Sequence, residues 1–391
     1  MGGKLSTLEG LEYGCPAQLE AVRSADPLRA DELCARLRGM NDDADVAALA
    51  ESLRALLPDP GQIGQLSTDE CLAAMRDLGM FLGSIKRHGT EPAEAVPESL
   101  PVLTELGRRT DMVPRDTVLH YCVWNPEGPR RRMYTGDPQE RILQDSVRHA
   151  FPRLNTGLRI CDELTRTDPA AERFAALARE LDECVGAMLE SINAVMAEVS
   201  PVFFARTLRP YFEEITLRGR TYLGPAAAQV PLWLVDEVLW LSDRGVAEYE
   251  NFLLDSVPYG LPRWRELHAG WRGRPSVVTR LVEAFDAVGG HDRAGHRLRD
   301  GANALAGVLG TIVTFRGRHY RIARQAYQEE VRLYPRGSGG AGVDLLQRVL
   351  LLTRQNARVA AERTDQRRRS SRLASPTPTP AERTERRTPG P

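Results

Sequence analysis

The chain has 391 residues, of which 42% are hydrophobic and 27% are charged, and its formal net charge is -1. This length and composition allow a sizeable core, and the balanced charge lacks the strong basic excess that is typical of nucleic-acid-binding proteins. The six cysteines are scattered without a CxxC pair, so the sequence supports no disulfide framework, zinc site or covalently attached c-type haem.

Residues 1–130 are predicted to form a smaller, mainly helical part of the protein. The segment up to residue 30 contains several turn-forming residues and is expected to be irregular. Apolar residues then recur at three- and four-residue spacing, which predicts helices over 30–57 and 68–85. The following segment is rich in proline and glycine, and the run from Thr117 to Trp124 indicates one short β-strand.

Almost all of the remaining chain is predicted to be helical, so the expected fold class is all-α. Helices are expected over 138–150, 155–165, 171–199, 202–214, 230–243, 245–254, 275–288, 298–333 and 343–362. The helix over 298–333 is expected to break or bend near Gly310. We expect residues 131–363 to form the main helical domain and residues 364–391 to form a disordered tail, because that segment is rich in arginine and proline.

Common catalytic and targeting motifs are absent from the sequence. It contains no GxGxxG after a strand, no GxxxxGK[ST], no HExxH and no GxSxG. The N-terminus lacks a signal-peptide pattern, and no run approaches the roughly 20 apolar residues of a membrane span. We therefore expect a cytoplasmic protein that binds neither nucleic acid nor a membrane.

One histidine, His319, lies on the apolar face of a predicted helix. Its neighbours at helical spacing include Ile312, Phe315 and Ala323. A histidine in such a position is most often a hydrogen-bonded core residue. A haem iron, however, needs a neutral imidazole in a dry pocket, with its second nitrogen bonded to an acceptor, and a core-facing helix can supply that geometry.

Three other segments have an unusual composition. Residues 200–212 combine four aromatic side chains with Arg206 and Arg209. They lead to residues 219–233, where small side chains would let a flat ligand approach the backbone. A glycine- and serine-rich loop, residues 336–342, follows soon after His319. Each segment alone is also compatible with an ordinary helix, loop or flexible connection.

In this order, the four features resemble the second half of the indoleamine 2,3-dioxygenase superfamily. The matching positions are Phe203 to Tyr211, Gly224 to Gln229, His319, and Gly337 to Gly340. The resemblance covers residues 195–362 well and the first half only loosely. Within this superfamily, the chain is most similar to monodechloroaminopyrrolnitrin synthase and its bacterial relatives. The reasons are the short gap between His319 and Gly337 and the GPAAAQxPLW segment.

The resemblance implies an indoleamine/tryptophan dioxygenase-like haem fold and a role for each matching residue. Haem b would be bound non-covalently, with His319 as the proximal iron ligand. Arg209 would hold a substrate carboxylate, and Ser338 would hydrogen-bond the substrate or bound oxygen. Tyr327 follows His319 by eight residues, near the same face if the helix continues, so it either reaches the edge of the pocket or only packs. The residues expected to line the haem or the closing loop are Ala226, Ala227, Ala228, Gly337 and Gly339. The residues on the distal side of the haem, opposite His319, stay unassigned. Candidates lie between Gln139 and Val147 and at Tyr121 and Cys122.

The implied function is the O₂-dependent oxidation of tryptophan or of a modified tryptophan, halogenated or not, in specialised metabolism. The partners would be a small indole or amino-acid substrate and an unspecified electron donor, in a monomer or a homodimer. Two alternatives stay open at this point. One is haem-dependent oxygenation of a non-indole amino acid or amine, and the other is a non-catalytic haem-binding or helical interaction protein.

Overall fold

The computed structural model describes residues 15–288, 293–328 and 330–373. Over these residues the regular structure is almost entirely helical. The strands of this described part form one antiparallel hairpin, β1 (Ile215–Leu217) and β2 (Arg220–Tyr222), in which Ile215 pairs with Tyr222. The predicted all-α class is confirmed.

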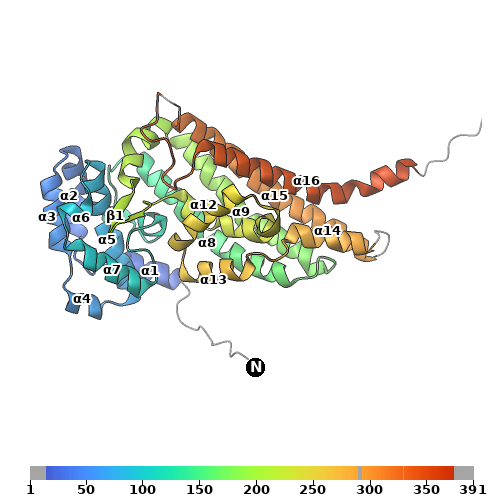
Figure 1. Cartoon of the computed structure of the whole chain (residues 1–391), viewed down its shortest axis with the longest axis horizontal. Helices are drawn as coiled ribbons and strands as arrows, with labels where there is room; N and C mark the ends of the chain where they lie inside the picture. Colours follow the sequence, from blue (N-terminus) through green and yellow to red (C-terminus); the bar gives the residue numbers. More distant parts are fainter. Residues whose placement is uncertain (1–14, 289–292, 329, 374–391) are drawn as a thin grey trace, which may run out of the picture.

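The N-terminal helices gather at one end of the molecule (Figure 1). They are α1 (Pro16–Ser24), α2 (Asp31–Asp42), α3 (Val46–Leu56), α4 (Pro60–Gln65), α5 (Thr68–Arg87), α6 (Pro92–Ala95) and α7 (Ser99–Thr110). Helix α5 is their centre, because every residue from Cys71 to Ile85 is buried. Its start is defined by a capping box between Ser67 and Glu70, which satisfies backbone N–H groups at the helix end.

Four long helices form the body of the molecule and run along its long axis (Figure 1). They are α8 (Pro138–Arg166), α9 (Glu172–Glu198), α15 (Arg293–Ala326) and α16 (Val343–Leu373). Helix α9 packs against both α8 and α15, and α15 packs against α16. The shorter helical elements are η1 (Leu119–Val123), η2 (Gly128–Arg130), η3 (Phe203–Leu208), η4 (Arg209–Phe212), η5 (Ala227–Gln229), α10 (Leu232–Asp236), η6 (Glu237–Leu241), α11 (Ser242–Arg244), α12 (Ala247–Ser256), η7 (Val257–Tyr259), α13 (Pro262–Trp271) and α14 (Val277–Val288).

The strand predicted between Thr117 and Trp124 is wrong, because this run contains the π-helix η1. All of its residues are buried, from Thr117 to Trp124. A short apolar run that is buried on every side has no periodicity, so sequence cannot distinguish a strand from a buried helical turn.

Several predicted helix boundaries also differ from the structure. The segments 138–150 and 155–165 form one helix, α8, which continues through Pro152 because Phe151 and Leu154 are fully buried beside it. Helix α15 runs through Gly310 without a break. An interior glycine costs only about 1 kcal/mol, and the neighbouring Leu309 and Ile312 are fully buried. Sequence analysis missed α1, α4, α6, α7, α13 and the β1–β2 hairpin.

The C-terminal helix is longer than predicted. Helix α16 continues past the expected end at Glu362 to Leu373, so the predicted start of the tail at residue 364 falls inside a helix. Residues 374–391 lie outside the described residues. The predicted boundary at residues 130–131 remains a prediction.

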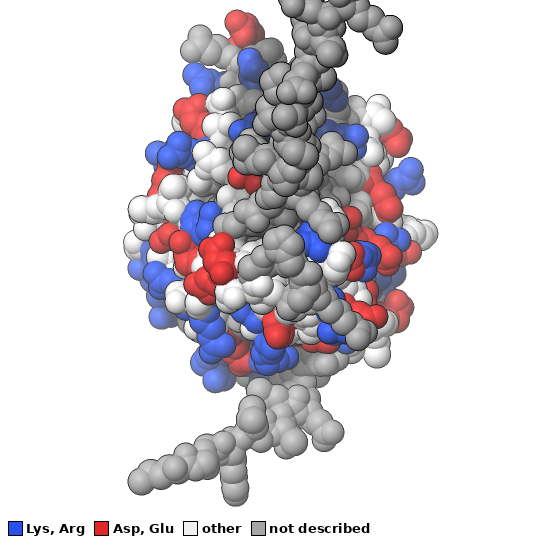
Figure 2. All heavy atoms as spheres, turned by 90° about the vertical axis from the view of Figure 1, so that its right-hand side faces the viewer, with Lys and Arg blue, Asp and Glu red and all other residues white. Residues whose placement is uncertain are grey.

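Within the described ranges, no single helix is long and apolar enough to cross a membrane. Helix α9 and the η3–η4 segment together are long and apolar enough for a span, but the two are bent by 93° relative to each other. Figure 2 shows acidic and basic side chains interspersed on one face, which matches the near-zero net charge.

Candidate active site

A cavity of about 370 Å³ lies among the long helices and the loops that connect them. Its walls come from α8, α9, η1, η3, η4, α10, α12, α15 and α16, and from residues within 199–201, 225–230 and 337–342. Most lining side chains are apolar, including Phe204, Leu208, Phe212 and Phe315. A concave, mainly apolar cavity with a few polar groups is typical of a small-molecule site.

The cavity brings together most of the site residues predicted from the sequence. Its lining includes His319, Tyr327, Ser338, Gly337, Gly339, Ala226, Ala227 and Ala228. Arg209 is not among the lining residues. It lies next to the hydroxyl group of Tyr327, at the edge of the cavity.

His319 presents a neutral imidazole to this cavity. Its ring stacks on Phe315, with 5.8 Å between the ring centroids. Burial, together with the nearby Arg316 guanidinium, lowers the pKa of His319 to about 4. The imidazole is therefore unprotonated at neutral pH, which is the form that binds a metal ion. The acceptor that we expected for its second nitrogen is not found within the described ranges.

A buried polar network anchors the helix one turn before His319. Arg316 donates to the carboxylate of Asp236 and to the hydroxyl of Thr353. Tyr249 and Trp240 also donate to Asp236, at 2.7 and 3.1 Å. The network ties α15 to α10, η6, α12 and α16, and it restricts the rotation of α15 about its axis. Sequence analysis missed it, although an arginine on the apolar face of the helix was a signal.

Arg209 is a buried cation with unused hydrogen-bonding capacity. Its side chain is only 5% exposed, and its Nε and Nη1 have no hydrogen-bond partner among the described residues. The ring of Tyr334 covers the guanidinium at 4.5 Å. Burying a charged group without partners costs free energy, so an anion that reached these nitrogens would be bound favourably.

The loop after α15 packs tightly on the loop before α10. A Cβ on Gly339 would lie 2.8 Å from the Cβ of Ala228, so only glycine fits at this position. Within the loop, the Gly337 N–H donates to the carbonyl of Ala341 at 2.9 Å, and Gly340 has a φ of +81°. This close approach places Ser338 in the cavity wall.

The first half of the chain supplies another part of the wall. Of the predicted distal candidates, Tyr121, Cys122, Leu143, Ser146 and Val147 line the cavity. The Tyr121 hydroxyl donates to the fully buried carboxylate of Glu140 at 2.8 Å. Burial raises the pKa of Glu140, although four hydrogen bonds to its carboxylate oppose this shift.

Two of the wall segments, η1 and η3, are π-helices, and a third π-helix, η6, follows α10. π-Helical turns are rare and often occur at functional sites. Sequence analysis could not identify them, because the extra residue in each turn is stabilised by packing and not by a local pattern.

These features fit a haem group. The cavity is mainly apolar, its lining contains one neutral imidazole, and small residues of two loops, Gly337, Gly339 and Ala226 to Ala228, form part of its wall. The described part of the chain contains no group of three or more His, Cys, Asp or Glu residues that could hold a metal ion by itself. Iron at this site would therefore depend on a porphyrin, with His319 as its protein ligand.

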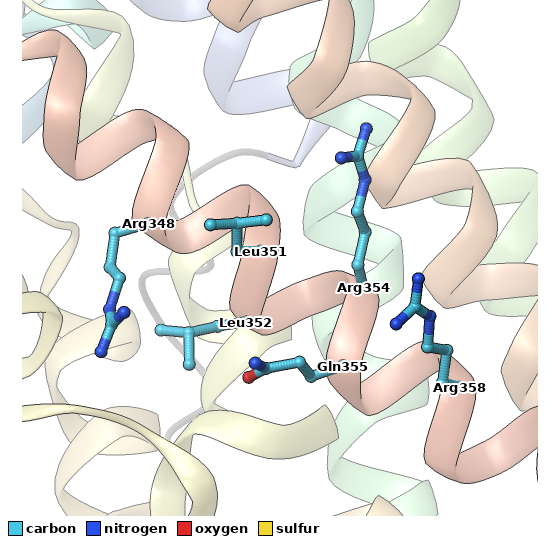
Figure 3. A pocket seen from close by; sticks show the side chains of 6 residues that line it. All are labelled: Arg348, Leu351, Leu352, Arg354, Gln355 and Arg358. Carbon is cyan, nitrogen blue, oxygen red and sulfur yellow. The ribbon is translucent and has the colours of Figure 1, made fainter.

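A second, smaller hollow of about 220 Å³ lies along α16 (Figure 3). All of its lining side chains come from this one helix, and three of the six are the arginines Arg348, Arg354 and Arg358. No acid, histidine or cysteine lines it. It therefore lacks the converging groups that make the larger cavity the candidate active site.

A known protein family matches most of the chain. The family model described as monodechloroaminopyrrolnitrin synthase PrnB matches residues 18–375. The match includes the first half of the chain, where the sequence resemblance was only loose. This is a family of oxidoreductases that act on a tryptophan derivative, and it is part of the indoleamine/tryptophan dioxygenase-like superfamily. With nearly its whole length matched, the chain belongs to the monodechloroaminopyrrolnitrin synthase PrnB family of enzymes.

Proposed function

We propose that this enzyme binds haem b non-covalently through His319 and uses O₂ to oxidise tryptophan or a modified tryptophan in specialised metabolism. The main support is the neutral imidazole of His319 in the wall of an apolar cavity, in a chain that belongs to this family. When bound, the haem iron supplies the centre at which O₂ is activated for reaction with the indole ring.

The protein itself would bind and orient the substrate. The aromatic and aliphatic lining suits an indole ring, and it limits the access of water to the reacting groups. Arg209 is assigned to the substrate carboxylate, because its Nε and Nη1 are buried and unpartnered. A charge-assisted hydrogen bond of this kind both binds the substrate and fixes its orientation.

Tyr327 and Ser338 are assigned to the polar edge of the site. The Tyr327 hydroxyl lies beside Arg209, and it is 3.4 Å from the position of a Cβ on Gly337. It thus connects the carboxylate-binding arginine to the loop that carries Ser338. The Ser338 hydroxyl lines the cavity and is assigned a hydrogen bond to the substrate or to bound oxygen.

The first test is the visible absorption spectrum of the purified protein, compared with His319→Ala and with a control, His296→Ala, in the exposed part of the same helix. We expect a Soret band and a ferrous–CO spectrum in the wild type and in the control, and their loss or strong shift in His319→Ala. Failure of the wild type to take up haem after reconstitution would refute the assignment. Oxygen consumption with tryptophan and with halogenated tryptophans then tests the substrate.

A further inference from the structure

If Arg209 binds the substrate carboxylate, as proposed above, its N–H donors must stay free for this ligand. Glu213 follows Arg209 by four residues and carries the opposite charge. The obvious ion pair between them is nevertheless absent among the described residues, and Nε and Nη1 of Arg209 have no partner. The Glu213 carboxylate has a different hydrogen-bond partner.

That partner is Tyr334. Its hydroxyl donates to the carboxylate of Glu213, while its ring lies over the guanidinium of Arg209 at 4.5 Å. The same side chain therefore occupies the Glu213 carboxylate and covers one face of Arg209. A cation–π contact stabilises the guanidinium without consuming its N–H donors, which a carboxylate would do.

The segment that carries Tyr334 is tied to the same part of the chain as Arg209. Arg206, three residues before Arg209, donates to the carbonyls of Glu330 and Val331, the second at 3.0 Å. Between residues 332 and 336 only Tyr334 is not exposed, and Leu333 beside it is 52% exposed. An inward-facing tyrosine in an otherwise exposed segment indicates a specific contact.

We propose that Tyr334 is a positioning residue that holds Glu213 away from Arg209, so that the guanidinium stays free to bind the carboxylate of the substrate. Without the Tyr334 hydroxyl, Glu213 is released and competes with the substrate for Arg209. This competition would be specific for ligands that carry a carboxylate. Arg87 lies close enough to Tyr334 for its charge to lower the pKa of the Tyr334 hydroxyl, so Arg87 is a rival partner for a released Glu213.

The test is the binding of L-tryptophan and of tryptamine, which is the same indole ethylamine without the carboxylate, to four forms of the full-length holoenzyme. These are the wild type, Tyr334→Phe, Glu213→Gln and the double variant. Calorimetry measures binding without relying on the haem spectrum. Tyr222→Phe serves as a matched control, because it removes a hydroxyl from a half-buried tyrosine on β2.

We expect Tyr334→Phe to weaken tryptophan binding by about fivefold to twentyfold, the effect of about one charged hydrogen bond, with tryptamine binding unchanged. In the double variant, Glu213→Gln removes the competing charge, so tryptophan affinity should return to within about twofold of the wild type. Glu213→Gln alone and Tyr222→Phe should bind both ligands as the wild type does.

Three results would overturn the proposal. Equal losses for tryptophan and tryptamine would show that Tyr334 only supports the loop. Failure of the double variant to recover tryptophan binding would exclude competition by Glu213. A wild type that binds both ligands equally, with Arg209→Met unchanged, would refute the carboxylate-binding role of Arg209 itself. This third result identifies a failure of the proposed function, because it appears in the wild type and does not involve Tyr334.

Discussion

Burial sets the protonation and pairing of single residues around the cavity. His319 and His120 are both kept neutral by burial, while Arg209 is buried as a cation without a full set of partners. Such arrangements cost folding free energy, and they persist at functional sites where a ligand provides the missing interactions. Substitution of these residues should therefore affect the stability of the protein and its affinity for the ligand in different ways.

Replacement of Arg209 by methionine tests this difference. Methionine has a similar reach but carries no charge, so Arg209→Met should reduce tryptophan affinity by about tenfold to a hundredfold, the effect of a charged hydrogen bond. The free energy of unfolding should not fall, because an incompletely paired buried cation is removed. Calorimetric binding and urea denaturation measure the two effects. A large loss of stability with normal binding would contradict the role of Arg209.

His120 should make stability depend on pH. Its side chain is 1% exposed, and burial lowers its pKa to about 3. Below the ordinary value of 6.5 the unfolded chain binds a proton that the native chain does not, so this contribution is complete above pH 6.5 and is lost as the pH falls toward 3. The loss is about 1.4 kcal/mol per pH unit well below 6.5.

His120→Asn should make this decrease shallower, because asparagine does not titrate and its side-chain oxygen can still accept from the Thr117 N–H. Urea denaturation between pH 7.5 and pH 4 gives the slope of the unfolding free energy against pH for each protein. The exposed His296→Asn is the control and should keep the wild-type slope. An unchanged slope in His120→Asn would show that His120 does not contribute to the pH dependence.

At the scale of the elements, the site depends on the contact between two loops. The loop over residues 337–341 packs on residues 226–228, and both segments line the cavity. Arg206 and Tyr334 connect residues 330–334, which precede the first loop, to η3 and to Glu213 at the end of η4. The position of Ser338 thus follows from backbone contacts, which are sensitive to the addition of a single methyl group.

Two glycine substitutions in this region should have opposite outcomes. In Gly339→Ala the new Cβ would meet the Cβ of Ala228 at 2.8 Å, so we expect the loop to shift at a cost of about 1–3 kcal/mol and the KM for tryptophan to rise. Gly342 also lines the cavity, but nothing lies within 4 Å of its Cβ position, so Gly342→Ala should keep KM and kcat near wild type. Steady-state kinetics would distinguish the two, and equal effects would refute the packing argument.

At the scale of the whole molecule, the N-terminal helices support the walls of the cavity. Helix α5 packs against η1 and η4, which carry Tyr121 and Arg209. The rings of Tyr121, Tyr134 and Tyr211 stack in sequence, with 5.6 and 4.4 Å between successive centroids. Segments from the two parts of the chain thus share one packed core, and damage at this interface should affect the site as well as stability.

Gly83→Ala tests the packing at this interface. A Cβ at this position of α5 would lie 2.5 Å from the Tyr134 hydroxyl and 2.8 Å from the Tyr211 carbonyl, so we expect a loss of about 1–3 kcal/mol in unfolding free energy. Gly39 is also helical but has nothing within 4 Å of its Cβ position, so Gly39→Ala should stabilise the protein by up to about 1 kcal/mol. Equal stabilities would contradict a tightly packed interface.

The sequence by itself determined the fold class, most of the long helices and the four segments of the site. Helical periodicity is a local property, so the position of His319 on an apolar stripe was visible without any tertiary contact. The order of the aromatic–arginine, glycine–alanine, histidine and glycine–serine segments was sufficient to indicate the family, which the match over residues 18–375 confirms.

Only the tertiary structure decided which distant residues meet. Asp236 pairs with Arg316, and Tyr334 stands between Glu213 and Arg209, although neither arrangement leaves a periodic pattern in the chain. The π-helical backbone of η1 is also set by tertiary packing, because a segment that is buried on all sides adopts the conformation that its neighbours allow. Local propensity selects helices, whereas side-chain packing across the core selects the partners of each buried charge.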